Sequence, residues 1–214
     1  MPKKLIILGG GESGVGAAIL AKQKGYEVLV SDSGSLKEVY RNELDAAGIE
    51  WEEGKHSEEK ILAGDEIMKS PGIPEKNEMV KKIRRKGIPV ISEIELAYRF
   101  KGDSKIVAIT GSNGKTTTTS LIWHILKTGG LDAALVGNIG ESFAKQVAVD
   151  PKPVYVVEVS SFQLDDIVDF RADIAVLTNI TEDHLDRYDY RFEKYIESKF
   201  RIIKNQKAGD YFIY

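Results

Sequence analysis

A glycine-rich turn that ends in a lysine lies between an apolar run at residues 106–109 and a helical stretch at residues 116–127. Its glycines expose successive backbone N–H groups, the lysine offers a positive charge to phosphate oxygens, and the next hydroxyl can ligate Mg²⁺. Strand, loop, lysine, hydroxyl and helix follow in the order that a phosphate-binding loop requires, which predicts an α/β domain. The turn reads Thr110-Gly111-Ser112-Asn113-Gly114-Lys115-Thr116-Thr117.

The spacing within this loop differs from the common pattern GxxxxGK[ST], because Ile109 occupies the position of the first glycine. The alternative is a turn rich in glycine and serine whose lysine is accidental. A phosphate loop also needs a carboxylate for Mg²⁺, and Glu158 directly follows the apolar run 154–157, which resembles a strand buried on both faces. Thr116 and Glu158 are therefore candidate metal ligands, with a solvated strand end as the alternative for Glu158.

A second glycine-rich turn, Gly9-Gly10-Gly11-Glu12-Ser13-Gly14, follows the apolar run 5–8 and precedes a helical stretch at residues 15–24. This GxGxxG pattern points backbone amides at the start of a helix, where an anion is favoured. Asp32 ends the second apolar run, at a position where an acidic residue of a dinucleotide fold accepts hydrogen bonds from ribose hydroxyls. The pattern favours a nucleotide ligand, although glycines in such a turn can serve packing alone.

Short apolar runs alternate with helical stretches along the whole chain, which predicts parallel strands joined by crossover helices. The polar residues 101–104 interrupt this alternation before a fresh apolar run. We therefore expect a Rossmann-like parallel-sheet domain at residues 1–102 and a P-loop ATPase α/β domain at residues 103–214. Residues 210–214 begin a strand that no helix follows, which favours truncation of the second domain inside a longer protein.

Composition excludes several classes of protein. With 42% hydrophobic residues and a net charge of −3, the chain is globular rather than disordered, and 30 basic against 33 acidic residues create no net positive field for nucleic acid. The absence of cysteine excludes disulfides, a thiol nucleophile and Cys-ligated zinc. No stretch reaches the roughly 18 apolar residues of a membrane span. We expect a cytoplasmic monomer without nucleic acid or membrane partners.

Several motifs resemble those of the Mur ligases in order and spacing, and the resemblance covers essentially the whole chain. They are the phosphate loop, Gly137-Asn138-Ile139-Gly140, Glu158-Val159-Ser160-Ser161-Phe162-Gln163-Leu164, residues 179–187 and Ser70-Pro71-Gly72-Ile73. The resemblance implies an ATP-dependent amide-bond ligase of peptidoglycan precursor synthesis, and so a role in cell wall formation, cell shape and division. Within the family, the motifs are most similar to the member that adds D-glutamate to UDP-N-acetylmuramoyl-L-alanine through an acyl phosphate.

The resemblance also implies roles for individual residues. The loop residues 111–117 bind the phosphates of ATP, and Lys115 stabilises the transferred phosphoryl group. Thr116 and Glu158 hold one Mg²⁺, and His184 helps to hold a second. The first domain binds UDP rather than a dinucleotide, and the implied substrate-binding residues are Glu12, Ser13, Asp32, Ser33, Ser70, Pro71, Gly72, Asn138, Ser160 and Gln163.

Lys199 is out of place on the apolar stripe of the helix predicted at residues 192–204. Helical spacing puts it on the same face as the following residues: Phe192, Tyr195, Ile196, Phe200 and Ile203. One interpretation is that its stem packs on the core while its ammonium reaches water. The resemblance implies another, in which CO₂ carbamylates the lysine so that it interacts with the second Mg²⁺ beside His184.

Three other functions are compatible with some of these motifs. An NAD-linked oxidoreductase would use Asp32 and the first glycine turn, but it leaves the phosphate loop and Glu158 unexplained. A regulatory P-loop module without catalysis would not need Glu158 and His184 near Lys115. A Mur-type ligase that adds another amino acid would share the ATP site, because the resemblance places the amino-acid site in a further domain. For the same reason we expect no ligase turnover from these 214 residues alone.

Overall fold

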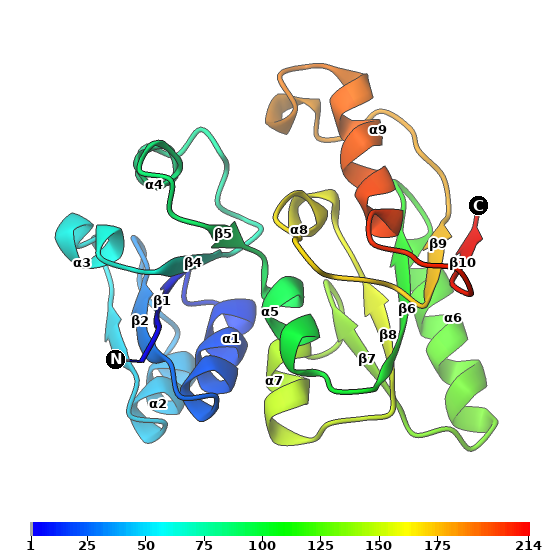
Figure 1. Ribbon diagram of the computed structural model, residues 1–214, viewed down its shortest axis with the longest axis horizontal. Helices are drawn as coiled ribbons and strands as arrows, with labels where there is room; N and C mark the ends of the chain where they lie inside the picture. The colour runs from blue at the N-terminus through cyan, green and yellow to red at the C-terminus, as the bar shows by residue number, and fades with distance from the viewer. Residues whose placement is uncertain (1) are drawn as a thin grey trace.

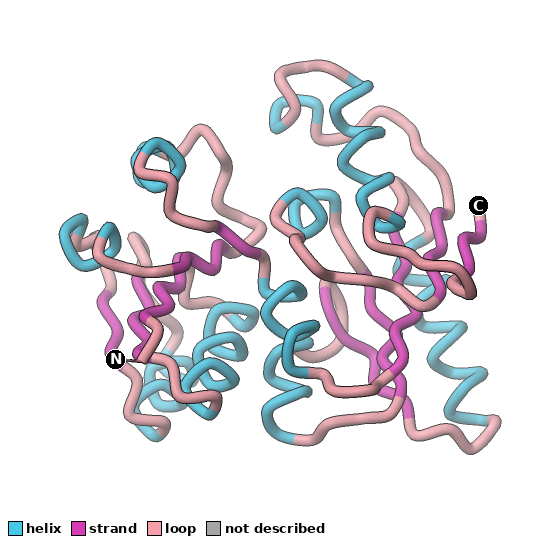
Figure 2. Tube along the Cα trace, in the orientation of Figure 1, coloured by secondary structure: helices cyan, strands magenta, loops and turns pink. Residues whose placement is uncertain are grey.

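The computed structural model describes residues 2–214, so the first residue of the expected domain 1–102 lies outside the described range. Two five-stranded sheets form the centres of two units, and the strand pairs in both sheets are parallel. Figures 1 and 2 show the two units side by side, with helices on both faces of each sheet. The predicted α/β fold class, with two parallel-sheet units, is confirmed.

The first unit has the strand order β3-β2-β1-β4-β5, which is the order of a Rossmann-like sheet. Residues 5–8 of its central strand are at most 1% exposed, as expected for an apolar strand covered on both faces. The elements are β1 (Lys4–Leu8), α1 (Glu12–Gln23), β2 (Glu27–Ser31), α2 (Glu38–Ala46), β3 (Glu50–Glu52), α3 (Glu58–Leu62), β4 (Glu66–Lys69), α4 (Glu78–Arg85), β5 (Val90–Ile91) and α5 (Glu93–Phe100).

The glycine turn after β1 lies where the strand order reverses, because β1 pairs with β2 on one side and with β4 on the other. Gly9 has a φ of +93°, and a Cβ at this position would lie 2.6 Å from Ser70 Oγ. A Cβ on Gly14 would lie 1.9 Å from the carbonyl oxygen of Gly9. Close packing thus leaves no room for a side chain at either position. The turn lies at the edge of the sheet where α/β proteins bind ligands.

The second unit has the strand order β10-β9-β6-β8-β7, with β6 between β8 and β9. The phosphate loop therefore also follows a strand at which the order reverses. Across residues 2–214 no helix combines the length and the apolar character needed to cross a bilayer. The elements are β6 (Lys105–Thr110), α6 (Lys115–Thr128), β7 (Ala133–Gly137), α7 (Phe143–Val149), β8 (Val154–Glu158), α8 (Ser161–Asp165), β9 (Ile174–Leu177), the 3₁₀ turn η1 (Leu185–Arg187), α9 (Phe192–Phe200), the 3₁₀ turn η2 (Arg201–Ile203) and β10 (Tyr211–Ile213).

Helices α1 and α5 of the first unit pack against α7 of the second, between the two sheets (Figure 1). The backbones approach closely at Gly16, where a Cβ would lie 2.1 Å from Ser142 Oγ. Glu93, 1% exposed, accepts hydrogen bonds from Ser142 Oγ at 2.7 Å and the Ala144 amide at 2.6 Å, and burial raises its pKa to about 7. One apolar cluster extends through both units.

Candidate active site

The phosphate loop between β6 and α6 is held by the segment that follows β9. The Asn113 amide donates to Asn179 Oδ1 at 3.0 Å, and Ser112 Oγ donates to the Thr181 carbonyl at 2.9 Å. Gly111 needs to be glycine, because it has a φ of +148° and a Cβ there would lie 1.9 Å from Thr178 Oγ1. The loop thus has a fixed shape at the N-terminus of a 14-residue helix, where partial positive charge favours an anion.

Lys115 is the first residue of α6, and its side chain folds back over the loop. Its ammonium donates to the carbonyl oxygens of Gly111 at 2.8 Å and Ser112 at 2.9 Å. A phosphate is a stronger acceptor for this group than a neutral carbonyl, because charge-assisted hydrogen bonds are about twice as strong as neutral ones. Lys115 is therefore poised to turn towards a phosphate on the loop.

Thr116 and Glu158, the two expected Mg²⁺ ligands, lie in direct contact. Thr116 Oγ1 donates to Glu158 Oε2 at 2.8 Å, while Asn138 Nδ2 donates to Glu158 Oε1 at 2.8 Å. Mg²⁺ in phosphate-binding sites takes one or two protein oxygens and completes its shell with phosphate oxygens and water. The hydroxyl and the carboxylate fit that pattern, whereas residues 2–214 contain no group of three or more His, Asp or Glu side chains that could hold a metal by themselves.

A cavity of about 250 Å³ joins the two units beside the phosphate loop. Three basic side chains and one acidic side chain line it, so it favours an anionic ligand. The cavity brings together seven residues that the sequence singled out: Pro71, Gly72, Lys115, Asn138, Ser160, His184 and Lys199. The sequence analysis gave no role to the other lining residues, which are Ser161, Phe162, Asp183, Arg187 and Tyr195.

Lys199 lies beneath the phosphate loop. It is 2% exposed, its ammonium donates to the Gly111 carbonyl at 2.8 Å, and it lies 4.5 Å from the centre of the Tyr195 ring. Burial, together with the charge of Lys115, lowers the pKa of Lys199 to about 8. The ammonium therefore does not reach water, and the interpretation of a lysine that extends past the core into solvent is wrong.

His184 lines the same cavity, and its backbone has a left-handed φ of 50°. Its ring centre is 5.2 Å from that of Phe162, and its Nε2 is 3.5 Å from Asp183 Oδ2. The side chain is 53% exposed, so it remains accessible to a ligand. The cavity thus contains His184 and Lys115 together, as the ligase hypothesis requires and as a simple phosphate-binding module would not.

The expected UDP-binding residues of the first unit divide into two groups. Pro71 and Gly72 reach the cavity. Asp32 instead shapes the glycine turn, since its carboxylate accepts from the Gly10 amide at 2.7 Å and the Gly34 amide at 2.8 Å. Its neighbours in the same region are Ser13 in the first turn of α1, Ser33 in the exposed loop after β2, and Ser70, whose hydroxyl donates to the Gly9 carbonyl at 3.3 Å.

Glu12 and Gln163 do not line the cavity. The Glu12 carboxylate accepts a hydrogen bond from the Ser142 amide of the second unit at 3.2 Å. Gln163 is 1% exposed, and its Oε1 accepts from the Ser160 amide at 2.9 Å, which completes a capping box at the start of α8. The structure thus gives both side chains partners within the protein, and their expected contacts with substrate remain predictions.

Arg187 is a residue of the cavity to which the sequence analysis assigned no role. Its guanidinium lies 4.1 Å from the centre of the Phe162 ring, and its Nη2 donates to the Pro71 carbonyl of the first unit at 3.1 Å. Residues 179–187 had been recognised as a motif, yet only His184 in it was given a role. Contact between Arg187 and the first unit depends on how the units pack, which the sequence does not show.

Comparison with known proteins agrees with this geometry. Residues 3–92 match the MurD-like N-terminal domain of Mur ligases, and residues 109–214 match the Mur ligase middle domain. The chain is 59% identical over 214 residues to UDP-N-acetylmuramoylalanine–D-glutamate ligase of Cytophaga hutchinsonii and 57% identical over 212 residues to that of Bacteroides fragilis. These alignments cover 100% and 99% of the chain but 48% of each relative, so the chain spans about half the length of these curated relatives.

Solved structures show the same fold at lower identity. A UDP-N-acetylmuramate:L-alanyl-gamma-D-glutamyl-meso-diaminopimelate ligase from Neisseria meningitides has a TM-score of 0.65 at 22% identity, over 99% of this chain and 71% of that one. UDP-N-acetylmuramate-alanine ligase from Thermotoga maritima has a TM-score of 0.58 at 20% identity, over 96% and 47%. The chain belongs to the Mur ligase family and contains its N-terminal and middle domains, which confirms the resemblance seen in the motifs.

Proposed function

We propose that the chain forms the nucleotide-substrate and ATP-binding parts of a ligase that joins D-glutamate to UDP-N-acetylmuramoyl-L-alanine with consumption of ATP. The observation that carries this proposal is the cavity between the units, where Pro71 and Gly72 face Lys115 of the phosphate loop. A ligase of this kind has to bring the carboxylate of one substrate to the γ-phosphate of another. The cavity offers a place where both could lie, lined by basic side chains that offset their negative charge.

The residues around the loop would have different roles in phosphoryl transfer. The loop amides and the N-terminus of α6 would hold the β- and γ-phosphates, and Lys115 would stabilise the charge that develops on the transferred group. A bound Mg²⁺ would neutralise phosphate charge, with Thr116 and Glu158 as its protein ligands. Asn138, which donates to Glu158, keeps that carboxylate oriented towards the loop.

The reaction would proceed through an acyl phosphate. The substrate carboxylate would receive the γ-phosphoryl group, and the resulting acyl phosphate would react with the amine of D-glutamate, with release of phosphate. The choice of D-glutamate rests on the names of the relatives, because a ligase for another amino acid would share this ATP site. We also propose a cytoplasmic monomer that acts in peptidoglycan precursor synthesis and binds neither nucleic acid nor membrane.

Titration calorimetry of the chain tests this function directly. We expect UDP-N-acetylmuramoyl-L-alanine to bind and NAD not to bind, because the proposed site is built from residues of both units, whereas an NAD site would use the first unit alone. Binding of NAD without binding of the UDP-linked substrate would favour the oxidoreductase, for which Asp32 and the Rossmann-like strand order are the supporting features. Binding of ATP alone would leave only a phosphate-binding module.

Replacing Glu158 with glutamine should weaken Mg²⁺-dependent binding of ATP by about tenfold, because the change removes a charged metal ligand but keeps the shape of the side chain. Glu158 is 1% exposed, and the amide oxygen of a glutamine at this position can still accept the hydrogen bond from Thr116, so the fold should survive. Calorimetric titration of ATP with and without Mg²⁺ measures the effect, and Glu141→Gln, after the nearby strand β7, is the control. Equal loss of affinity in the absence of Mg²⁺ would contradict a role in metal binding.

A further inference from the structure

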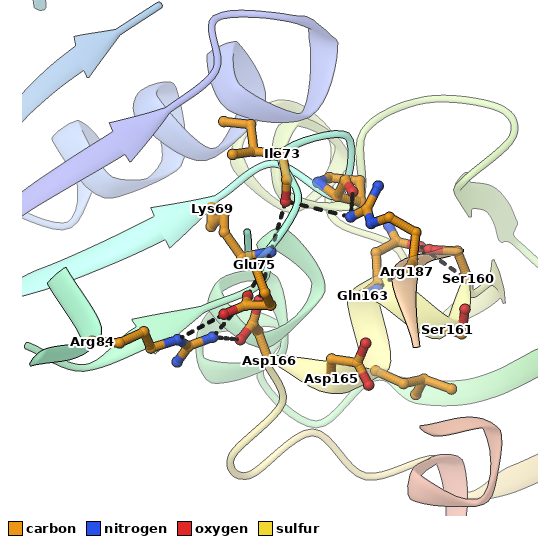
Figure 3. A network of polar contacts seen from close by, with 12 residues as sticks. Lys69, Ile73, Glu75, Arg84, Ser160, Ser161, Gln163, Asp165, Asp166 and Arg187 are labelled. Atoms are coloured by element: carbon orange, nitrogen blue, oxygen red, sulfur yellow. Dashed lines mark hydrogen bonds and ion pairs between the residues drawn. The ribbon is translucent and has the colours of Figure 1, made fainter. Parts of the chain in front are cut away.

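Residues 70–75 of the first unit run along the second unit and are flanked by charged contacts on both sides (Figure 3). The segment begins directly after β4, and its Pro71 and Gly72 line the cavity beside the phosphate loop. Its position therefore determines where the first unit presents its part of a ligand to the second. The side chains that hold this segment come from β4, α4 and η1 and from Asp166 just after α8.

The first of these contacts is a buried ion pair between the units. Lys69, the last residue of β4, has its ammonium 3.1 Å from Asp166 Oδ2, just after α8. The side chain of Lys69 is 3% exposed and that of Asp166 is 2% exposed. The Lys69 ammonium also donates to the Ile73 carbonyl at 3.3 Å, so the same cation holds the segment and its anchor in the second unit. Removing one member of such a buried pair leaves an uncompensated charge, which is strongly unfavourable.

Arg84 of α4 strengthens this anchor. Its Nη2 donates to Asp166 Oδ1, and the same guanidinium binds both carboxylate oxygens of Glu75, at 3.1 and 3.2 Å. The ion pair with Glu75 holds the far end of the segment to α4 within the first unit. Asp166 is therefore the one acidic group of the second unit in this cluster, and it receives two cations from the first unit.

Arg187 of η1 provides the contact on the other side of the segment. Its Nη2 donates to the carbonyl oxygens of Pro71 at 3.1 Å and Ile73 at 3.4 Å, and its guanidinium stacks on Phe162 of α8. Figure 3 shows the contact of Arg187 with Ile73 and, apart from it, the cluster of Asp166 with Arg84 and Glu75. The two contacts together fix the segment relative to helix α8.

We propose that Asp166 is a positioning residue that, together with Arg187, holds residues 70–75 in the place required to bind a substrate across both units. Asp166 does not line the 250 Å³ cavity; it faces a separate cavity of about 440 Å³ with Arg84 and Glu75. It therefore acts through Lys69 and Arg84 rather than by contact with the substrate. This inference rests on the proposed function, because it requires a ligand with one end in each unit.

A ligand that spans two units gains affinity from the second contact only when the spacing of the units matches its length. The second contact is then intramolecular, and its contribution falls when the units move freely. Loss of the Asp166 contact should therefore lower the affinity for a ligand that contacts both units. The affinity of either unit for a ligand that contacts that unit alone should not change. A purely structural residue would lower the stability of the protein and show no such selectivity between ligands.

The experiment compares three ligands on wild type and on Asp166→Asn by titration calorimetry of the chain. UDP reports on the first unit, ATP with Mg²⁺ on the second, and UDP-N-acetylmuramoyl-L-alanine on both. We expect about tenfold weaker binding of the UDP-linked substrate, with unchanged binding of UDP and ATP. Arg84→Gln is a second variant in case Asp166→Asn fails to fold. The side chain of Arg84 is 40% exposed, and its replacement leaves the ion pair between Lys69 and Asp166 intact. This variant should show a smaller loss of affinity for the UDP-linked substrate.

Glu43→Gln is the matched control. Glu43 of α2 pairs with Lys145 of α7 at 2.7 Å, so this is also an ion pair between the units, but it lies away from residues 70–75. The control should bind all three ligands like wild type. Equal loss for Glu43→Gln, or unchanged binding of the UDP-linked substrate by Asp166→Asn and Arg84→Gln, overturns the proposal. A wild type that binds UDP but gains nothing from the rest of the substrate overturns the proposed function as well, which separates the two failures.

Discussion

Replacing Lys115 with alanine should lower phosphoryl transfer by about 10²- to 10³-fold in a ligase that carries this chain. The ammonium lies on the phosphate loop, where it contacts only the carbonyl oxygens of Gly111 and Ser112 among the hydrogen bonds of residues 2–214. These contacts are to neutral groups and are easily exchanged for a phosphate. The variant loses the cation of the phosphate loop, and residues 110–117 contain no other basic side chain that could replace it. Phosphate release measured under saturating substrates gives the rate.

The fold should remain intact in this variant, because the Lys115 side chain joins no two elements of secondary structure. Lys127→Ala is the control, since Lys127 lies at the opposite end of α6 and is 45% exposed. Thermal unfolding of both variants should match wild type within a few degrees. A rate for Lys115→Ala equal to that of Lys127→Ala would show that the loop amides alone stabilise the phosphate.

The parallel sheets of both units could be predicted from the sequence, because their strands are short and almost wholly apolar. The runs at residues 5–8 and 154–157 correspond to β1 and β8, and their burial on both faces is a direct consequence of crossover helices. Both glycine turns were also predicted, since strand, turn and helix are adjacent in the sequence. The short helices α3 and α8 were missed, because five residues give too few turns for a periodic pattern.

The contacts between the units could not be predicted. Glu95 illustrates the reason: it is fully buried, and its Oε2 accepts from three consecutive backbone amides, of Val168, Asp169 and Phe170. A glutamate in an amphipathic helix is ordinarily solvated, so its position among apolar residues gave no signal. The contact between Glu12 and Ser142, 130 residues further along the chain, gave no signal in the sequence either, and the expected contact of Glu12 with substrate stays a prediction. Pairs this distant depend on docking geometry that a single sequence does not contain.

The helical pattern at the end of the second unit placed Tyr195 and Lys199 on the buried face as expected, but it placed Phe200 there wrongly. The helix expected at residues 192–204 ends at Phe200 and continues as a 3₁₀ turn. Phe200 was assigned to the apolar stripe but is 41% exposed. The buried residues are Tyr195, Ser198, Lys199 and Ile202, and residues 198 and 199 each lie three or four positions from both 195 and 202. Lys199 is therefore buried on a face that also carries a polar serine, next to the phosphate loop.

The burial of Lys199 has a chemical consequence. CO₂ reacts only with a neutral amine: the nitrogen forms a bond to carbon and loses a proton, so a cation becomes an anionic carbamate. Burial and the charge of Lys115 lower the pKa of Lys199 to about 8, against about 10.5 for an ordinary lysine. The neutral fraction at pH 8 is then roughly half. At fixed dissolved CO₂, the carbamate fraction should therefore rise as the pH increases from 7 to 9.

Replacing Lys199 with alanine should reduce ligase activity by about a hundredfold in an enzyme that carries this chain, if, as the resemblance to the Mur ligases implies, a carbamate on Lys199 would supply an anion beside a bound Mg²⁺. Bicarbonate should not restore the variant by carbamylation, since no amine remains; a short carboxylic acid that enters the vacated space should restore part of the rate. Lys194→Ala is the control on the same helix, because Lys194 is 40% exposed and pairs with Asp189. ¹³C NMR of the wild type under ¹³CO₂ should show a carbamate signal that Lys199→Ala lacks and Lys194→Ala keeps. Full activity of Lys199→Ala would show that the buried amine serves only to hold the Gly111 carbonyl.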